Sequence, residues 1–450
     1  MKWIPALLFA LAAPFCTAAE PIDLGDRLEL FTDNYLLAGT DGDVEQVLIL
    51  PEPKDVVITC DDAWEGNTSG YFGLFEDGDE FKMIYRGWRH DPETKKELQD
   101  EVTCLAVSKN GLKFTKPNLG VREFKGSKEN NIIWNGGGSH NFFGFLDTNP
   151  EAKPEGKYKA LAGMKGGLVP LQSTDAVNWK KIVDKAVITN GAFDSQNLAF
   201  YDNHRGEYRA YWRYFSKTGF RAIRTATSKD FVNWEKEEDL KYTEGTPEQH
   251  LYTNAVQPYF RAPHLFIGFP TRYLPGEGQR VEPILMTSRD GVLFHRWNDP
   301  VVPESAPEDR KGNRSNYMTW GILQLPGKPD EISVYATESY YGPKPGRVRR
   351  FVYRTDGFVA LRGGKNGGNA TTKFLRTDED QLLVNYVANK GGSLVIEALD
   401  AGGNRFSTSK PLTGDSTAAK VEWEKPVDFK IGVKLRFSLT NADLYSIKFE

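Results

Sequence analysis

Short hydrophobic runs alternate with polar turns along most of the chain. Residues 71–75 and 81–86 are two such runs, separated by Asp77-Gly78-Asp79, and residues 198–201 and 208–214 repeat the arrangement. Runs of this length, bounded by Asp, Gly and Asn, are typical of antiparallel hairpins. Almost no segment has a helical period, so the pattern predicts an all-β fold built from β-meanders.

One motif recurs every 55 to 66 residues: a Ser, an Asp or Asn two positions later, and an aromatic ring six positions after the Ser. The complete copies are Ser108/Asn110/Phe114, Ser173/Asp175/Trp179, Ser228/Asp230/Trp234 and Ser288/Asp290/Phe294, and Arg354, Asp356 and Phe358 form a worn fifth copy. We expect the Asp or Asn to bond the backbone of its own turn, and the ring to pack on the neighbouring sheet. Five four-stranded units of this size predict a five-bladed β-propeller over residues 55–361.

The segments on either side of the repeats have a different character. Residues 363–368 are rich in glycine and are expected to form a linker, and alternating runs in residues 362–450 predict a C-terminal β-sandwich. Residues 20–54 contain strand-like runs that join or close the propeller. Residues 1–19 combine Lys2, an apolar stretch and small residues, which is typical of a secretory signal peptide. We therefore expect a secreted or periplasmic protein with no membrane association after signal removal.

Charge and cysteine content exclude several classes of partner. The 57 Lys and Arg residues face 61 Asp and Glu residues, and a net charge of -4 gives no reason to expect nucleic acid. After the signal peptide the chain has two cysteines, Cys60 and Cys104, which either pair or remain separate buried thiols. No CxxC motif or Cys/His cluster is present, so no metal and no cofactor is expected.

The propeller prediction also locates the candidate site. In a blade, the loops that enter the first strand and leave the second open on one face, so residues at these positions converge on one central funnel. The candidate catalytic carboxylates there are Asp194, Glu248, Glu65 and Glu338. The candidate substrate-binding residues are Arg86, His140, Asn197, Arg213, His250, Tyr252, Arg272 and Arg314. Salt bridges among these acids and bases are the simpler alternative explanation.

Glycosidic cleavage needs one protonated and one ionised carboxyl group, and the local sequence suggests which is which. Glu248 lies in an aromatic stretch suited to a general acid, whereas Asp194 has polar neighbours suited to a base or orienting group. Glu65 and Glu338 compete for the remaining role. The four arginines present forked donors that suit carboxylate or sulfate, so we hypothesise an anionic or densely hydroxylated glycan.

Residues 193–197 (FDSQN), 286–291 (MTSRDG) and 356–358 (DGF) resemble a group of secreted bacterial proteins similar to glycoside hydrolase family 32. That group is related to the five-bladed clans of families 32, 68 and 43, and the resemblance extends to residues 443–445 (DLY) near the end of the chain. It implies a propeller followed by a sandwich, with three acids in the funnel. The WMNDPN, RDP and EC motifs of family 32 are absent, so no residue role is carried over.

These observations together favour a secreted glycoside hydrolase that uses paired carboxylates on a polysaccharide or oligosaccharide. Two alternatives remain at this point. One is a non-catalytic glycan-binding propeller, since a fold does not establish a function. The other is a polysaccharide lyase, in which His250, Tyr252 and Arg272 would provide the base and the charge-neutralising group.

Overall fold

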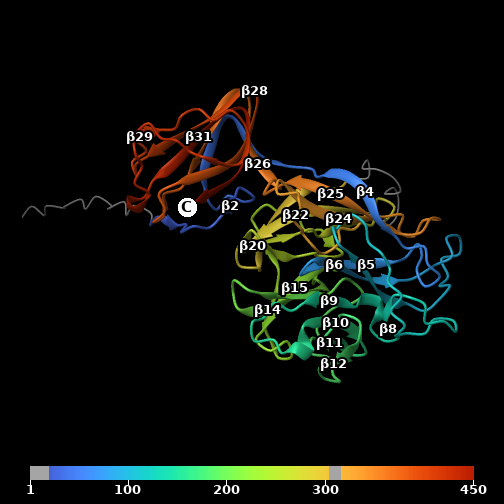
Figure 1. Ribbon diagram of the computed structural model, residues 1–450. Coiled ribbons are helices and arrows are strands. Elements are labelled where there is room, and N and C mark those ends of the chain that lie inside the picture. The colour runs from blue at the N-terminus through green and yellow to red at the C-terminus, as the bar shows by residue number, and fades with distance from the viewer. Residues whose placement is uncertain (1–19, 304–315) are drawn as a thin grey trace, which may run out of the picture. The chain divides into compact units, whose positions relative to one another are not determined.

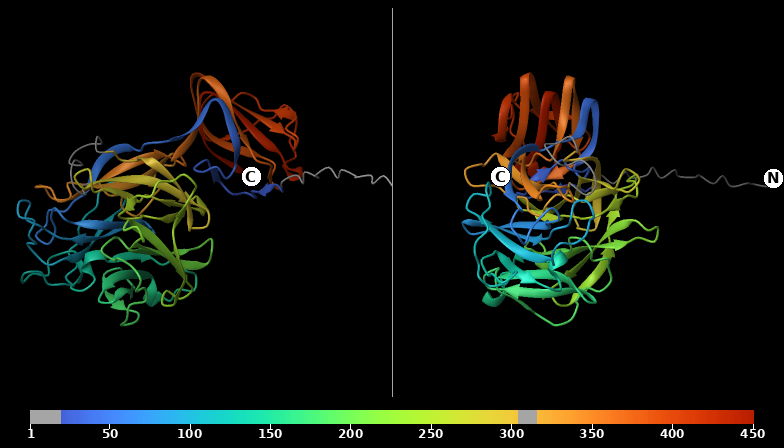
Figure 2. Two further views of the ribbon diagram at one scale, coloured as in Figure 1. Left: turned by 180° about the vertical axis from the view of Figure 1, so that it is seen from behind. Right: turned by 90° about the vertical axis from the view of Figure 1, so that its right-hand side faces the viewer.

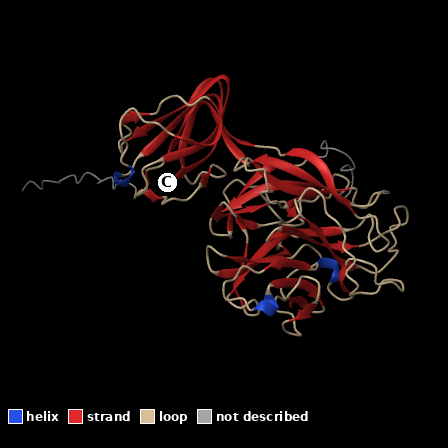
Figure 3. Cartoon of the chain, in the orientation of Figure 1, coloured by secondary structure: helices blue, strands red, loops and turns tan. Residues whose placement is uncertain are grey.

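The computed structural model describes residues 20–303 and 316–450. The predicted signal peptide (1–19) and Arg314 lie outside these ranges. Within them the chain consists of strands joined by turns, with three short 3-10 helices, η1 (Ser139–Asn141), η2 (Pro154–Gly156) and η3 (Phe429–Ile431) (Figure 3). The prediction of an all-β fold is confirmed. No helix in the described part of the chain has the length and apolar character needed to cross a membrane.

The chain divides into two compact units. The main unit comprises Leu28–Asp33 and Gln46–Ala360. The C-terminal unit comprises the described residues before Leu28, together with Asn34–Glu45 and Leu361–Glu450. The C-terminal unit therefore combines segments from distant parts of the sequence, as the colours in Figure 1 show.

The main unit contains five sheets among its described residues, in sequence order (Figures 1 and 2). The first comprises β5 (Gly70–Asp77), β6 (Glu80–Gly87), β7 (Val102–Ser108) and β8 (Ile132–Asn135). The second comprises β9 (Phe143–Leu146), β10 (Tyr158–Met164), β11 (Gly167–Ser173) and β12 (Trp179–Lys181). The third comprises β13 (Leu198–Asp202), β14 (Glu207–Phe215), β15 (Arg221–Ser228) and β16 (Trp234–Asp239).

The fourth and fifth sheets are less regular. The fourth comprises β17 (Lys241–Tyr242), β18 (His250–Leu251), β19 (Gln257–Tyr259), β20 (Ala262–Gly268), β21 (Thr271–Leu274), β22 (Arg280–Ser288) and β23 (Leu293–Pro300). The fifth comprises β24 (Glu331–Glu338), β25 (Arg347–Arg354) and β4 (Glu52–Thr59). In this last sheet β4 pairs antiparallel with β25, so a strand from the start of the main unit completes the sheet at its end.

The repeated motif forms the turn after the third strand of a sheet, and its expected hydrogen bonds are confirmed. In the third sheet, Asp230 Oδ1 accepts from the backbone N–H of Val232 at 2.9 Å and of Asn233 at 2.7 Å. Asn110, Asp175 and Asp290 make the same kind of bond in their copies. The ring of Phe294 lies 6.4 Å from that of Tyr211, which belongs to the preceding sheet, as the packing prediction requires.

The C-terminal unit is built around one sheet with the strand order β29–β28–β31–β26–β3, in which β30 also pairs with β28. Its strands are β3 (Leu37–Leu48), β26 (Val359–Thr372), β28 (Leu382–Leu399), β29 (Arg405–Thr408), β30 (Gly414–Lys420) and β31 (Lys434–Phe449). A short parallel pair is formed by β1 (Ile22–Asp23) and β27 (Leu375–Arg376). The remaining short strand, β2 (Glu29–Leu30), belongs to the main unit.

The glycine-rich segment 363–368 lies inside strand β26. The prediction that it forms a linker is therefore wrong. A Cβ atom on Gly363 would come within 2.5 Å of Leu439, and one on Gly368 within 2.3 Å of the carbonyl oxygen of Asp41. These glycines therefore serve close approach between backbones, where any side chain would collide.

Cys60 and Cys104 are both buried free thiols, so of the two alternatives for the cysteines the structure contains the separate thiols. They belong to a hydrophobic cluster of the main unit that also includes Tyr85 and Tyr335. Burial raises the pKa of both thiols well above its ordinary value. A buried thiol of this kind acts as a small apolar group.

Candidate active site

A cavity of about 200 Å³ lies in the main unit and is walled mainly by aromatic rings. The ring-bearing side chains that line it are Tyr71, Phe72, Trp88, Tyr252, Tyr317, Tyr340 and Tyr341. Its polar and charged lining comes from Arg86, His140, Asp194, Gln196, Thr253, Thr319 and Thr337. A concave, apolar site with a few convergent polar groups is the usual form of a small-molecule site.

The cavity is assembled from strand ends and loops of all five described sheets of the main unit. Tyr71 is at the start of β5, Arg86 near the end of β6, and Thr337 near the end of β24. His140 belongs to η1 just before β9, and Asp194 lies in the loop before β13. These are the loops that enter a first strand or leave a second one, which is where the sequence analysis placed the site.

Arg86 is the central cation of the cavity, and its side chain is 2% exposed. Its guanidinium donates to the carbonyl oxygen of Thr68 at 3.0 Å and to the Tyr340 hydroxyl at 2.6 Å. Its Cζ lies 4.6 Å from the ring centre of Tyr71 and 4.7 Å from that of Trp88, so cation–π contacts hold the planar group between two rings.

A chain of hydrogen bonds joins two carboxylates through one imidazole at the mouth of the cavity. His140 Nδ1 lies 2.6 Å from Glu101 Oε1, and His140 Nε2 lies 2.8 Å from Asp194 Oδ1. Asp194 is exposed, and its second oxygen lies 3.7 Å from Arg213 Nη2. Arg86 is also near this chain, with Nη1 3.9 Å from Glu101.

These contacts set opposite charges on the two groups that face solvent. The hydrogen bond to His140 is the main cause that holds the pKa of Asp194 well below its usual range, so the carboxylate is ionised at neutral pH. Burial lowers the pKa of His140, but the bonds to Asp194 and Glu101 outweigh burial and raise it above its ordinary value. An imidazolium therefore lies beside a carboxylate.

Three of the side chains that line the cavity carry a buried polar atom that has no hydrogen-bond partner among residues 20–303 and 316–450. They are Arg86 Nε, Trp88 Nε1 and Thr319 Oγ1, in residues that are 2%, 8% and 3% exposed. Buried polar groups in native proteins are nearly always bonded, and each exception calls for an explanation such as a ligand or ordered water. A ligand rich in oxygen atoms suits these donors.

Of the predicted site residues, the structure brings Asp194, Arg86, His140 and Tyr252 together in this cavity. Arg213 joins them from the side, with its Cζ 5.1 Å from the ring of Tyr252. The other described candidates lie elsewhere.

Glu65 is fully buried and does not line the cavity. It accepts hydrogen bonds from the Tyr85 hydroxyl and from Lys116 Nζ, the latter at 2.6 Å. Lys116 Nζ also lies 3.1 Å from Asp61 and 3.0 Å from Asp62, so its ammonium fills the centre of this acidic group. A buried carboxylate needs such a partner, which gives Glu65 a structural role in place of the predicted catalytic one.

Glu338 and Arg272 are also removed from the cavity by salt bridges within their own sheets. Thr337 lines the cavity, and because successive strand residues point to opposite faces, Glu338 points away, where it binds Arg347 at 3.2 Å and Arg349 at 3.0 Å. Arg272 donates to Glu282 Oε1 at 2.9 Å, its direct partner on the neighbouring strand. The alternative of paired charges thus holds for these two residues.

Glu248 lines a separate depression beside Tyr214 and Phe215, where it is exposed and accepts hydrogen bonds from Ser216 and Thr218. The structure therefore does not bring Glu248 to the cavity of Asp194, and no pair of these two carboxylates forms.

His250 and Asn197 make structural contacts. His250 Nδ1 accepts from the backbone N–H of Arg221 at 3.0 Å, and its pKa is lowered by burial and by Arg221. The Asn197 amide donates to the carbonyl oxygens of Phe193 at 2.7 Å and Ser195 at 3.0 Å, which shapes the loop that carries Asp194.

Glu101 and Tyr340 also belong to the site, although neither is among the residues predicted from the sequence. Glu101 directly precedes β7 and therefore sits at the far end of the same loop that begins after Arg86. Including the residue before each third strand would have found it. Tyr340 follows β24, and only its contact with Arg86 identifies it as part of the cavity.

No protein-family profile matches the chain, and a search of curated proteins finds no relative. Among solved structures, a glycoside hydrolase family 43 arabinoxylan arabinofuranohydrolase from Bacillus subtilis is 10% identical, with a TM-score of 0.45, over 87% of this chain and 97% of that one. A β-1,2-mannobiose phosphorylase from Listeria innocua is 14% identical, with a TM-score of 0.44, over 68% and 94%. An N-acetylgalactosamine deacetylase from F. plautii is 12% identical, with a TM-score of 0.40, over 88% and 96%. At these values the similarity assigns no reaction to the chain.

Proposed function

We propose that the protein is a carbohydrate-active enzyme that hydrolyses a glycosidic bond of an anionic glycan in the cavity around Arg86. The observation that carries this proposal is the combination of a buried arginine, an imidazole–carboxylate pair and an aromatic wall in one cavity. We also propose that the five sheets of the main unit are propeller blades, that the C-terminal unit is a sandwich, and that the protein is secreted.

The wall supports a sugar as the ligand. Aromatic rings stack on the apolar faces of sugar rings, and the hydroxyl groups around a sugar suit the unpartnered atoms of Arg86, Trp88 and Thr319. A purely apolar ligand would leave these donors unsatisfied, at a cost of about 1–3 kcal/mol each.

The charges support an anionic group on that sugar. Arg86 is buried, and the nearest carboxylate in its described surroundings, Glu101, lies 3.9 Å away and is already bound to His140. Among the described residues Arg86 Nε has no partner, and an arginine N–H forms a strong charge-assisted hydrogen bond with a carboxylate or sulfate oxygen. The imidazolium of His140 adds a second positive group.

Asp194 and His140 provide the acid–base chemistry in this proposal. Asp194 is the one carboxylate among the described residues that line the cavity, so His140 takes the part of the general acid. His140 gives its proton to the glycosidic oxygen as the bond to the anomeric carbon breaks. Water attacks that carbon and loses its proton to Asp194, and the hydrogen bond between the two side chains returns the proton to His140.

The matched pair of substitutions Asp194→Asn and Glu248→Gln tests this function. With reducing ends measured on sulfated, uronate-containing and neutral glycans, we expect cleavage of the anionic substrate. Asp194→Asn should lower kcat by roughly 100-fold or more, because proton transfer contributes about that factor. Glu248→Gln, outside the cavity, should stay within about twofold on the same scale. Unchanged cleavage by Asp194→Asn would show the proposal to be wrong.

One observation also favours a polysaccharide lyase. The lyase alternative relied on His250, Tyr252 and Arg272, whereas the structure groups His140, Tyr340 and Arg86. An arginine that neutralises a uronate carboxylate beside a histidine and a tyrosine suits proton abstraction next to that group. Ultraviolet absorbance from an unsaturated product would identify this reaction, and binding without any product would identify a glycan-binding protein.

A further inference from the structure

We propose that a second cleft, adjoining the cavity, binds the sugar next to the anionic one and selects a neutral or basic residue there. This inference rests on the proposed function and specifies its substrate: an anionic sugar joined to a sugar without an acidic group. The cleft, here called the acidic cleft, has a volume of about 1160 Å³ and is formed by the loop of residues 88–101, by residues 123–125 and by Asn135 and Gly136.

The acidic cleft and the cavity share two side chains. Trp88 and His140 line both of them, and their rings are 5.8 Å apart. A ligand that occupies both spaces therefore passes beside His140, the group that gives its proton to the glycosidic oxygen in the proposed reaction. The two sugars joined by the bond that is cleaved would then lie one in each space.

The charges of the two spaces differ in sign. The acidic cleft is lined by Glu97, Asp100, Glu101 and Glu123 against one lysine, Lys125. Glu101 is bound to His140, whereas Glu97, Asp100 and Glu123 form no ion pair with the described part of the chain. Uncompensated carboxylates repel a second anionic group and favour a neutral or cationic one.

Buried donors without a partner in the described part of the chain, one of them shared with the cavity, indicate that the acidic cleft receives a polar ligand. Trp88 is 8% exposed, and its buried Nε1 has no hydrogen-bond partner in the part of the chain that the structure describes. The Gln99 side-chain nitrogen, in the same lining, is also without one. The exposed Leu98 and the half-buried ring of Phe124 add apolar surface, so the lining combines rings, unsatisfied donors and carboxylates as an amino or neutral sugar requires.

Disaccharides with the same anionic residue and different partners test the selection. The probes are glucuronate or galacturonate linked to glucose, to glucosamine or to a second uronate, at low ionic strength. We expect kcat/KM for the neutral and amino partners to exceed that for the second uronate by roughly tenfold, and the ratio to shrink in salt, which screens exposed charges. Equal values for all three partners would overturn the inference.

A variant carrying Glu97→Gln, Asp100→Asn and Glu123→Gln tests the residues. It should raise kcat/KM for the disaccharide with a second uronate, because the repelling charges are gone. The preference for the neutral and amino partners should then fall to within about threefold. Glu93→Gln is the matched control, because Glu93 is exposed on the same loop outside the lining, and it should leave the ratio unchanged. A triple variant with the full preference of the native chain would also overturn the inference.

An aryl glycoside of the uronate separates this inference from the proposed function, because it places no sugar in the acidic cleft. Its hydrolysis should be the same in the native chain and in the Glu93→Gln control, so it reports on the proposed function alone. If the native chain hydrolyses neither the aryl glycoside nor any disaccharide, the proposed function fails. Calorimetric Kd values for the same disaccharides then test whether the acidic cleft selects a neutral or basic sugar. A tenfold preference in Kd supports it, and equal Kd values or no binding overturn it.

Discussion

His140 has a carboxylate on each side, and this arrangement fixes how the site should respond to pH. Its pKa is raised because Asp194 and Glu101 outweigh burial, so the imidazolium persists above the usual pKa of about 6.5. We expect kcat/KM to fall as pH rises through the raised pKa. The contribution of this ion pair to the free energy of unfolding is complete below the pKa that His140 has in the unfolded chain. It is lost as pH rises through the raised pKa of His140 in the folded state.

Glu101→Gln tests this expectation, because it removes one carboxylate that raises the pKa of His140. The high-pH fall in kcat/KM should then move to lower pH, and an NMR titration of the His140 ring should show the same shift. Asp79→Asn, at a side chain that is 94% exposed, should move neither curve. A profile that is identical in Glu101→Gln and the native chain would contradict the role of Glu101 as a positioning residue.

Arg86→Lys tests the anion site while keeping the charge. A lysine has a point charge, so it cannot cover both Tyr71 and Trp88 and also donate to Thr68 and Tyr340. We expect Kd for an anionic sugar to rise by roughly tenfold or more, as for the loss of a charge-assisted hydrogen bond. Kd for the neutral analogue should change little, and equal losses for both ligands would argue against a carboxylate or sulfate at Arg86.

Single residues also show which parts of the site can be predicted from the sequence. Arg86, His140 and Asp194 could be placed because the loop rule depends only on strand order. Glu338 could not, because its neighbour Thr337 faces the cavity and the direction of one side chain on a strand depends on register. Glu248 could not either, because the long path before β18 determines which depression it reaches.

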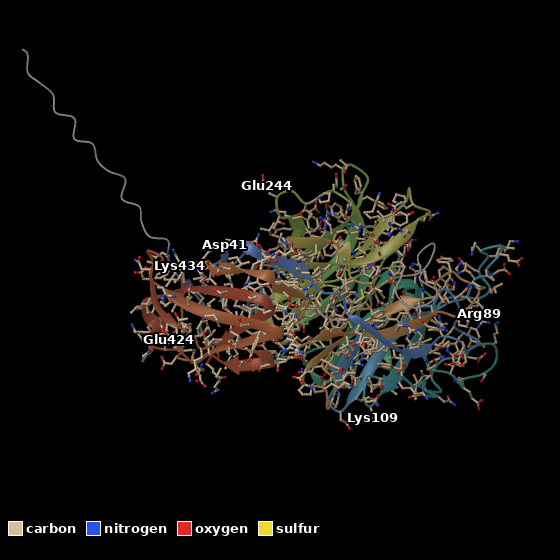
Figure 4. The ribbon with its side chains drawn as sticks, turned by 90° about the horizontal axis from the view of Figure 1, so that it is seen from above. Asp41, Arg89, Lys109, Glu244, Glu424 and Lys434 are labelled. Carbon is tan, nitrogen blue, oxygen red and sulfur yellow. The ribbon has the colours of Figure 1, made fainter. Side chains whose placement is uncertain are left out.

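At the level of elements, the repeated turns stabilise the sheets away from the site. Arg89, which follows β6 on the cavity side, and Lys109, in the first repeated turn, lie at separate places on the main unit in Figure 4. The turns and the cavity are at opposite ends of the strands, because β6 and β7 are antiparallel. Changes in the turns should therefore affect stability without affecting activity.

Asp230→Ala should lower the free energy of unfolding by about 1–3 kcal/mol, because the backbone N–H groups of Val232 and Asn233 lose their acceptor. Asp230→Asn should cost much less, since Asn110 makes the same bond in the first copy. Urea unfolding measures both, and kcat per folded molecule should stay unchanged. Equal effects of alanine and asparagine would mean that the side-chain acceptor is not what stabilises the turn.

The repeated turns and strand β26 show which structural features can be predicted from local sequence and which cannot. The repeated motif could be interpreted from sequence because its hydrogen bonds are local. The glycine-rich segment 363–368 was misinterpreted, since its glycines are explained by Leu439 and Asp41, which are distant in sequence. Pairing of strands that are far apart along the chain leaves no local signature.

At the level of the whole molecule, the C-terminal unit depends on both ends of the chain. Strand β3 lies at the end of the sheet order beside β26, and β1 pairs with β27. A chain of residues 20–360 would leave β3 as an unpaired edge strand, and such edges promote aggregation. We expect low soluble yield and larger aggregates than the native chain forms in size-exclusion chromatography, whereas substitution of the exposed turn at Gly402 should keep the native elution volume. A monomeric truncated chain with the native Tm would contradict this.

The pairing of β4 with β25 has a consequence for the order of biosynthesis. The ribosome releases β4 before any strand of the first four sheets, yet its partner emerges only when the main unit is nearly complete. During translation β4 therefore remains a strand without its pairing partner, and long-range closure of this kind is slow. A nascent chain of this protein should bind chaperones until Arg347–Arg354 have emerged from the ribosome. It should release them when β4 pairs with β25.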